Sequence, residues 1–525
     1  HPRMLNTLAE AANRGCKVIS INPLRERGLA RWRPPSNPFA GATALAERFV
    51  RVRIGGDIAL IKGIMKELLA LESSEPGTVL DRDFIDQHTE GFEALLGALD
   101  EWRFEELVEQ SGIPREEMRE IAEIYAASER VIACWATGLN QHRHGADNVQ
   151  ELANLLMLRG NLGKPGAGLC PLQGHSNAPG IRSMGIATRP EMAFLTRLGR
   201  EFEFTAPAGP GYNCVEAIHA MQDGKVQVFV GLGGNFAAAS PDTEYTAEAL
   251  SRCRLTVQVA TRLNRSHLIT GREAILLPCL CRSERDHQLS GDQFVSVESA
   301  MGRVRRSQGQ REPASAALRS EPAIVAAMAR ATLGDSTEVP WEELIVDYER
   351  IRERISRTSA GFEDQGDRIR GPNGFALPNR ARDREFTTPS RRARFRVVPL
   401  PEIASGKGRL LLMTVRSHDQ FNTTVYGDGD RYRGVGAGRR VVLLNRTDME
   451  AMGFSEGQRL DLTSHLENRT RSISGLEAVA YDVPAGCAVS YFPEANPLFP
   501  IDHVAPGCGT PAYKLLPISL APSRD

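Results

Sequence analysis

The stretch RGNLGKPGAGLCPLQGHSNAPGIRSMG, residues 159–185, decides how this chain is interpreted, because seven glycines and three prolines follow directly after an apolar helical run. Glycine admits positive φ angles and lets the backbone approach a ligand closely. A long connection without secondary structure is typically either functional or disordered. Disordered segments usually have a charged or repetitive composition, and this stretch has neither. We therefore expect a polar ligand-binding wall between two domains.

Upstream of this stretch the chain opens with HPRMLNTLAEAANRGCKVISIN. Leu5, Leu8 and Ala12 have helical spacing, and residues 17–22 alternate like a buried strand. The pattern predicts a βαβ unit that is cut just before its first helix. We accordingly expect residues that do chemistry to lie upstream of His1.

Charge and length are typical of a globular protein of two to four domains. The 525 residues include 64 basic and 65 acidic side chains, so no net field attracts nucleic acid. No apolar run approaches the roughly 20 residues that a membrane-spanning helix needs. The nine cysteines form no CxxC pair, so neither a zinc ribbon nor an iron–sulfur ligand set is predicted in this portion. We expect reduced, mostly buried thiols in a cytoplasmic protein.

Residues 1–172 alternate short strands with helices and predict a first α/β domain. Asp57 stands at the start of an apolar run, where its carboxylate would cap a helix N-terminus. The other predicted elements are strands at 50–54 and 130–135 and helices at 114–129 and 148–158.

Residues 173–400 repeat the alternation and predict a second α/β domain. Its predicted elements are strands at 226–230, 255–259 and 274–277 and a helix at 244–251. Both domains are predicted to be doubly wound, with ligands at the carboxyl ends of parallel strands. Stretches rich in Arg, Ser, Gly and Pro, at 302–320 and 352–395, predict surface connections, and 380–400 predicts a linker.

Residues 405–525 change character and predict a small closed β-barrel. Short apolar segments alternate there with turn signals, and a single short helix near 448–452 interrupts them. The predicted strands are 410–415, 441–444, 460–463, 478–481 and 488–491.

Two motifs in the α/β part carry weak signals. GLGGNF, from residue 231, lacks the third glycine of a dinucleotide fingerprint, and no acidic residue follows the next strand at Val259, so NAD-type binding is not predicted. Asn235 in this motif fits a ligand-binding amide and a turn residue equally well. His142 and His144 lie two apart in QHRHG, but a metal site needs a third ligand, and we interpret both as surface-loop residues.

The barrel carries the polar residues with the clearest common chemistry. TVRSHDQFNTT follows its first strand, and its Arg416 has the planar fork that pairs with phosphate. Further hydrogen-bonding candidates at the edges of the barrel are Ser417, His418, Asn422, Thr423, Asn496, Tyr513 and Lys514. Taken singly each fits a turn or surface residue, but together they favour a large polar ligand that bears phosphate.

The sequence is similar to the molybdopterin oxidoreductases because it carries their motifs in order along the chain. These motifs are NLGKPGAG, GHSN, VFVGLGGN, ILLP, TVRSHDQFNTT, NRTDMEAMGFSEGQRLDLTS and TPAYK. Within them it resembles the formate-dehydrogenase-like FdhF/YdeP branch, over essentially all 525 residues. The resemblance implies a molybdenum (or tungsten) centre held by two molybdopterin guanine dinucleotides, and a [4Fe–4S] cluster in the complete protein. It also implies that the last domain is a double-psi β-barrel.

The resemblance assigns roles to residues of this sequence. It places Gly174 and His175 in the pterin-contacting loop, and Asn22 and Asp57 near strand ends that face one guanosine. The second nucleotide is assigned to Asn235 and Gln258, and the barrel's pterin and phosphate contacts to Arg416, Ser417, His418, Asn422, Asn496, Tyr513 and Lys514.

Two residues depart from the family pattern. Gln173 stands where formate dehydrogenases have an active-site Arg, which puts formate in doubt, and Val259 stands where many relatives have Asp. The resemblance places the metal-ligating residue and the cluster cysteines upstream of His1. Catalytic residues therefore stay unassigned, apart from Gln173 and His175 as residues that face the pterin or substrate pocket.

The expected activity is an oxidoreductase reaction that moves electrons between a small-molecule substrate and an iron–sulfur relay. An electron-transfer subunit is a possible partner, whereas nucleic acid and a membrane span are not expected. The alternative is a non-catalytic scaffold subunit of an electron-transfer complex. The polar residues retained at 416–423 favour the enzyme.

Overall fold

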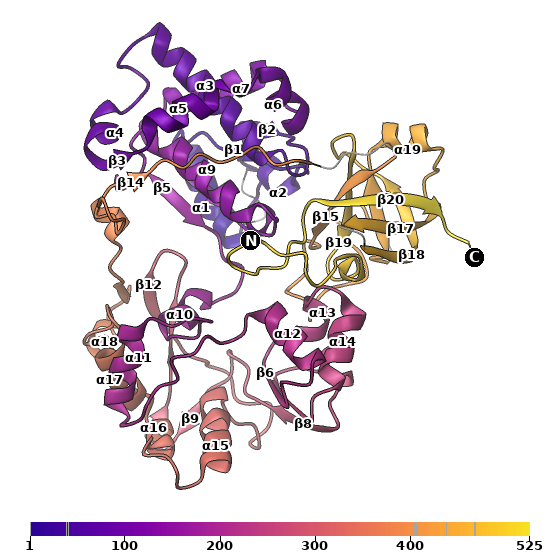
Figure 1. Cartoon of the computed structure of the whole chain (residues 1–525). Coiled ribbons are helices and arrows are strands. Elements are labelled where there is room, and N and C mark those ends of the chain that lie inside the picture. The colour runs from indigo at the N-terminus through magenta and orange to yellow at the C-terminus, as the bar shows by residue number, and fades with distance from the viewer. Residues whose placement is uncertain are drawn as a thin grey trace.

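The computed structural model describes residues 2–37, 39, 41–403, 408–436, 438–466 and 469–524. His1 and the predicted start of the third domain at residue 405 lie outside the described residues. Two α/β units lie one above the other, and a barrel lies beside the upper one (Figure 1). We call them the first unit, the second unit and the barrel, and the domain boundaries at 172 and 400 stay predictions.

The first unit is mostly helical. Its parallel strand pairs are β1 (Ile19–Ile21) with β2 (Arg48–Val50), and β4 (Ile132–Trp135) with β5 (Gly168–Pro171). Its helices are α1 (Pro2–Asn13), α2 (Arg27–Ala30), α3 (Asp57–Ser74), α4 (Arg82–His88), α5 (Phe92–Asp100), α6 (Phe104–Ser111), α7 (Arg115–Ala126), α8 (Thr137–Asn140) and α9 (Gly145–Met157). The N-cap of α3 is Gly56 rather than Asp57, so the predicted capping role of Asp57 is wrong.

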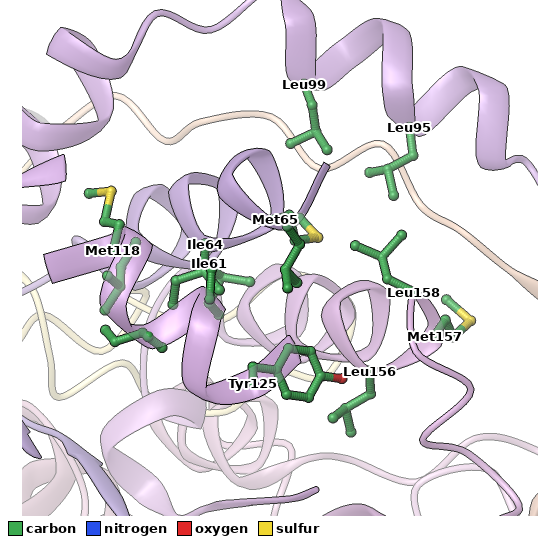
Figure 2. Packing of buried hydrophobic residues seen from close by; sticks show 14 of the residues in the cluster. Ile61, Ile64, Met65, Leu95, Leu99, Met118, Tyr125, Leu156, Met157 and Leu158 are labelled. Atoms are coloured by element: carbon green, nitrogen blue, oxygen red, sulfur yellow. The ribbon is translucent and has the colours of Figure 1, made fainter. Parts of the chain in front are cut away.

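The core of the first unit surrounds α3, whose sequence DIALIKGIMKELLALESS is apolar on most sides and therefore suits a buried helix. Figure 2 shows the α3 side chains packing among residues of α5, α7 and the end of α9: Ile61, Ile64, Met65, Leu95, Leu99, Met118, Tyr125, Leu156, Met157 and Leu158. Lys62 is buried with them, and its Nζ lies 2.8 Å from Oε1 of Glu151 in α9. This pairing compensates two charges that are at most 1% exposed.

The second unit contains the parallel sheet β6–β7–β8, formed by Val228–Leu232, Leu255–Ala260 and Glu273–Pro278. An antiparallel sheet joins β11 (Val295–Glu298), β12 (Arg303–Ser307) and β13 (Phe375–Ala376), and β9 (His287–Gln288) pairs with β10 (Gly291–Asp292). The helices are α10 (Ala178–Ser183), α11 (Met192–Glu201), α12 (Cys214–Gln222), α13 (Phe236–Ala239), α14 (Thr243–Ser251), η1 (Arg265–Leu268), α15 (Glu321–Leu333), α16 (Trp341–Val346), α17 (Tyr348–Thr358), α18 (Gln365–Arg368) and η2 (Arg380–Asp383).

Three stretches predicted as surface connections or linker are structured instead. Residues 302–320 contain β12, and 352–395 contain most of α17, in which Arg352 is buried against Glu349 and Phe294. Residues 380–400 include β14 (Ala393–Arg394), which pairs in parallel with β3 (Thr89–Glu90) of the first unit. Their arginine content favoured a prediction of surface connections, but Arg352 is buried by its ion pair with Glu349 and its contact with the Phe294 ring.

The barrel confirms the predicted closed β domain. Its six strands close in the order β15–β19–β16–β18–β17–β20, and parallel pairs alternate with antiparallel ones over part of the ring. The elements are β15 (Leu410–Val415), β16 (Val441–Leu444), α19 (Arg446–Met452), β17 (Arg459–Leu466), β18 (Arg469–Ala480), β19 (Cys487–Tyr491), η3 (Asn496–Leu498) and β20 (Leu516–Pro522).

The nine cysteines are free, as expected, but most are not buried. Cys253, Cys279 and Cys487 are buried, Cys170 is half-buried, and the exposed ones are Cys16, Cys134, Cys214, Cys281 and Cys508. The expectation of mostly buried thiols is therefore wrong. Among the described residues, no helix combines the length and the apolar content that crossing a membrane requires.

Candidate functional site

Basic side chains from both the first unit and the barrel gather where these two regions meet. Arg416 directly follows β15, and Lys514 shortly precedes β20. The backbone N–H of Lys514 donates to the carbonyl of Gln141 at 3.0 Å, which fixes the turn between α8 and α9 against the barrel. His142, the next residue of that turn, is only 4% exposed. We call Arg416, Lys514, His142 and His175 the basic cluster.

The pKa values of the basic cluster show that its members share one electrostatic field. Burial, with a further contribution from the charge of Arg416, lowers the pKa of Lys514 to about 7. Burial and the charge of Lys514 lower the pKa of His142 to about 3, and burial and Arg416 lower that of His175. Burial thus disfavours the charged form of all four side chains, and the charge of Arg416 adds to this effect at Lys514 and His175.

No carboxylate of the described residues lies within ion-pair distance of Arg416 or Lys514. The Lys514 ammonium instead donates to the carbonyl and the hydroxyl of Thr414. Arg416 donates to Asn422 Oδ1 at 3.4 Å and lies over the ring of Phe492. A buried cationic group without an ion-pair partner can be compensated by the charge of a bound anion.

An ion network next to the basic cluster fixes the loop that carries Arg416. His418 Nδ1 lies 3.1 Å from Asp430 Oδ1, and its Nε2 lies 3.0 Å from Glu26 Oε2 of the first unit. Arg433 bridges the same carboxylates at 2.8 and 2.6 Å and donates to the Arg416 carbonyl. Hydrogen bonds to Asp430 and Glu26 raise the pKa of His418 to about 9, so the imidazolium is the form present at neutral pH.

A second buried arginine holds the start of this loop. Arg439 donates to Ser417 Oγ at 2.7 Å and to Gln420 Oε1 at 3.0 Å, and it pairs with Glu494 at 2.7 Å. Ser417 is buried by these contacts. In this structure Ser417 and His418 therefore order the loop, while Arg416 is the member that carries unpaired charge.

Three predicted residues join the second unit to the barrel. Asn235 accepts from Ser266 Oγ at 2.6 Å and donates to the carbonyl of Thr423 at 2.9 Å. From the barrel, Asn496 donates to the carbonyl of Ala238 at 2.8 Å, and Tyr513 OH donates to that of Ala239 at 2.7 Å. The polar edge of the barrel is thereby aligned with the carboxyl end of β6.

Gln258 of β7 keeps a buried donor without a protein partner. Its side chain is 7% exposed, and Nε2 makes no hydrogen bond within the described part of the chain. Gly231 is its partner in β6, and a Cβ there would stand 2.4 Å from Gln258 Oε1. Glycine at 231 thus leaves room for an amide that is free to bind a ligand.

The two predicted residues of the first unit lie at strand or helix ends. Asn22 follows β1 and accepts the N–H of Leu24 at 2.9 Å through its side chain. Asp57 begins α3, and burial raises its pKa to about 6. A carboxylate with this pKa can accept hydrogen bonds from a ligand, which would restore its charge.

The glycine-rich stretch contains β5 and α10, which bracket an exposed loop. Asn161 anchors its start by accepting from Val131 N and donating to Tyr125 OH. Gln173, Gly174 and His175 lie exposed between β5 and α10, and the charge of Arg416 acts on His175. The stretch predicted as a polar ligand-binding wall therefore consists of a short strand, an exposed loop and a short helix.

The structure brings Arg416, Lys514 and His175 together, whereas Asn235, Asn496 and Tyr513 meet at a separate interface. Sequence reasoning missed the ion network and misread His142, which is buried rather than on the surface. The DRYR segment from Asp430 was a usable signal, because an acid and a base three residues apart in a glycine-rich loop can pair. In the described residues, no group of three His, Cys, Asp or Glu side chains could hold a metal ion.

Comparison with protein families finds two matches. Residues 7–285 match the molybdopterin oxidoreductase family, and residues 410–517 match the molydopterin dinucleotide binding domain. The second match covers nearly the whole barrel, including Arg416 and Lys514.

Several proteins are similar over all or much of the chain. An uncharacterized oxidoreductase of Mycobacterium tuberculosis (strain ATCC 25618 / H37Rv) is 45% identical over 100% of this chain and 68% of its own length, and Protein YdeP of Escherichia coli (strain K12) is 43% identical over 100% and 71%. The alpha subunit of F420-dependent formate dehydrogenase 2 from Methanococcus maripaludis is 26% identical over 58% of this chain and 42% of its own. Acetylene hydratase from Pelobacter acetylenicus has the same fold, with a TM-score of 0.66, 16% identity and coverage of 99% and 75%.

Proposed function

Because this chain belongs to the molybdopterin oxidoreductase family, we propose that it holds a molybdenum bis(molybdopterin guanine dinucleotide) centre and moves electrons between a small-molecule substrate and an iron–sulfur cluster. The observation that carries the proposal is the basic cluster. Arg416 and Lys514 bring cationic groups to one place and leave them without a carboxylate. The negative charge of a pyrophosphate or phosphate group would compensate the positive charge of Arg416 and Lys514.

The side chains present fit such a cofactor. Arg416 would bind a phosphate or pterin oxygen, and Lys514 would gain its proton on anion binding because its pKa rises next to negative charge. The orphaned amide of Gln258 and the carboxylate of Asp57 offer a donor and an acceptor for polar base edges. When bound, the metal centre supplies the two-electron chemistry, and the protein supplies binding and orientation.

We also propose that the reaction resembles that of formate dehydrogenases but that formate is not the preferred substrate. Gln173 is exposed in the glycine-rich loop, close in sequence to His175. Its amide is neutral and cannot attract a carboxylate as a guanidinium does. A small substrate without a carboxylate therefore suits this pocket better.

The electron partner and the compartment are also part of the proposal. An iron–sulfur cluster, with a possible electron-transfer subunit beyond it, would take the electrons released at the metal. The nine cysteines are all free thiols, which supports a reducing compartment such as the cytoplasm.

Cofactor analysis of purified protein tests the proposal. We expect molybdenum (or tungsten) by elemental analysis, oxidised pterin by fluorescence, and about two guanosine monophosphates per metal after acid hydrolysis. Absence of both metal and pterin would refute the assignment. If the cofactor is bound but no dye-linked turnover is found across small aldehydes, acids and oxyanions, the alternative of a non-catalytic scaffold is favoured instead.

A further inference from the structure

Two cysteines face each other across the parallel strand pair β4–β5 in the first unit. Cys134 and Cys170 are register partners, so both side chains project from the same face of the pair. Cys134 is exposed and Cys170 is half-buried. Neither thiol belongs to the basic cluster or to the ion network.

The two thiols influence each other's pKa. The hydrogen bond from the Cys134 thiol raises the pKa of Cys134 and lowers that of Cys170 to about 7. Both cysteines bind a metal ion in their thiolate form, so metal binding would release their protons.

A third sulfur comes from the second unit. Met301 lies in the turn between β11 and β12, and its Sδ is 3.7 Å from Cys170 Sγ. Met301 is 55% exposed, so hydrophobic burial does not explain why its side chain lies next to Cys170. The contact joins the two α/β units at the strand that leads into the glycine-rich loop.

The distance of 3.7 Å between Cys170 Sγ and Met301 Sδ suits two ligands of one metal ion. A metal–sulfur bond of about 2.3 Å places two sulfurs about 3.8 Å apart when the angle at the metal is tetrahedral. Thiolate and thioether together select soft ions, above all Cu(I), whereas Zn²⁺ sites use thiolate, imidazole or carboxylate.

We propose that Cys134, Cys170 and Met301 form an all-sulfur site for a soft monovalent cation, Cu(I) or an ion of the same chemistry. Binding replaces the thiol protons, which pass to solvent, by two metal–thiolate bonds and one metal–thioether bond, and no group changes oxidation state. The bound ion would pin the β11–β12 turn to β5. A disulfide between the two cysteines is the competing use of this pair, but it gives Met301 no role.

Anaerobic titration with Cu(I) alone, in competition with bicinchoninate, tests the site. We expect one tightly bound Cu(I) per protein, and X-ray absorption at the copper edge should show three sulfurs at about 2.3 Å. Cys134→Ser or Cys170→Ser should weaken binding at least about 100-fold, because even the loss of a group that only orients a ligand costs roughly 10- to 100-fold.

Met301→Leu separates the three-sulfur site from a simple dithiol. This exposed substitution leaves the fold intact, so we expect about tenfold weaker binding and a two-sulfur copper signal. Cys16→Ser, which removes an exposed thiol of the same unit, serves as the matched control and should leave binding unchanged. Equal affinity in wild type and Cys170→Ser would overturn the proposal, as would a copper signal that Met301→Leu does not alter. A Cys134–Cys170 disulfide in the mass spectrum, with no copper bound after its reduction, would also overturn it.

Discussion

Removing Arg416 should weaken cofactor binding without weakening the fold. In the described structure its guanidinium makes one long hydrogen bond of 3.4 Å, to Asn422, and a contact with the Phe492 ring, and no ion pair. Arg416→Ala should therefore change the free energy of unfolding by less than about 1 kcal/mol. A charge-assisted hydrogen bond to the cofactor contributes about 1.5 to 3 kcal/mol, which corresponds to roughly 10- to 100-fold in affinity.

Occupancy and stability are measured on the same preparations. The molybdenum-to-protein ratio and the pterin fluorescence report occupancy at limiting cofactor supply, and urea unfolding of the cofactor-free protein reports stability. Arg416→Lys should recover only part of the occupancy, because an ammonium lacks the planar fork. Arg431→Ala is the matched control, since Arg431 lies in the same barrel region but pairs with Asp419 at 3.5 Å on the surface.

Full occupancy and unchanged turnover in Arg416→Ala would refute the reasoning and make Arg416 a surface residue. A loss of occupancy accompanied by an equal loss of stability would also refute it, because the basic cluster would then serve the fold rather than a ligand. Reduced occupancy in Arg431→Ala would show that occupancy depends on the total positive charge of this region rather than on the position of Arg416.

Three further outcomes follow from the buried charges. The pKa of Lys514 is lowered to about 7, so the unfolded chain binds more protons above that value. Lys514 should therefore contribute a rise in the free energy of unfolding of cofactor-free protein from about pH 7 to about pH 10. The difference in unfolding free energy between wild type and Lys514→Met, from urea titrations at each pH, should show this rise. The pKa of His418 is raised to about 9, so its stabilisation is full below about pH 6.5 and is lost as the pH rises through about 9. His418→Gln should cost about 1.5 to 3 kcal/mol at about pH 6 and clearly less at about pH 10, and an equal cost at both would contradict this. Lys62→Met should destabilise by about 3 to 5 kcal/mol in calorimetry or urea unfolding, because it strands the Glu151 carboxylate, and Lys62→Met combined with Glu151→Leu should regain most of that loss.

Local patterns predicted the barrel strands that are short and apolar. The predicted strands 410–415 and 441–444 coincide with β15 and β16 because every residue there is hydrophobic or threonine between turn signals. The predicted strand at 478–481 covers only the end of the twelve-residue β18, because the first half of β18, RTRSIS, is polar and has Ile473 as its one buried residue. β20 was not predicted as a strand, since LPISLAP contains two prolines.

The site was predictable where it depends on one loop and hidden where it depends on distant residues. Arg416 and Lys514 stand in polar motifs that sequence reasoning found. Glu26 gave no signal, because its partners His418 and Arg433 lie 392 and 407 residues further along the chain. His142 is buried only because the barrel covers the turn after α8, which no local spacing could show.

The parallel pair β3–β14 has a consequence for biosynthesis. Asn154 of α9 exchanges two hydrogen bonds with the backbone of Arg396, at 2.7 and 3.0 Å, and the ring of Phe395 packs 5.6 Å from that of Phe92. The first α/β core is therefore completed by residues synthesised some 240 positions later. In a nascent chain that has emerged only as far as the glycine-rich stretch, Asn154 and Phe92 lack these partners. The core of the first unit can therefore be completed only after the second unit has been synthesised.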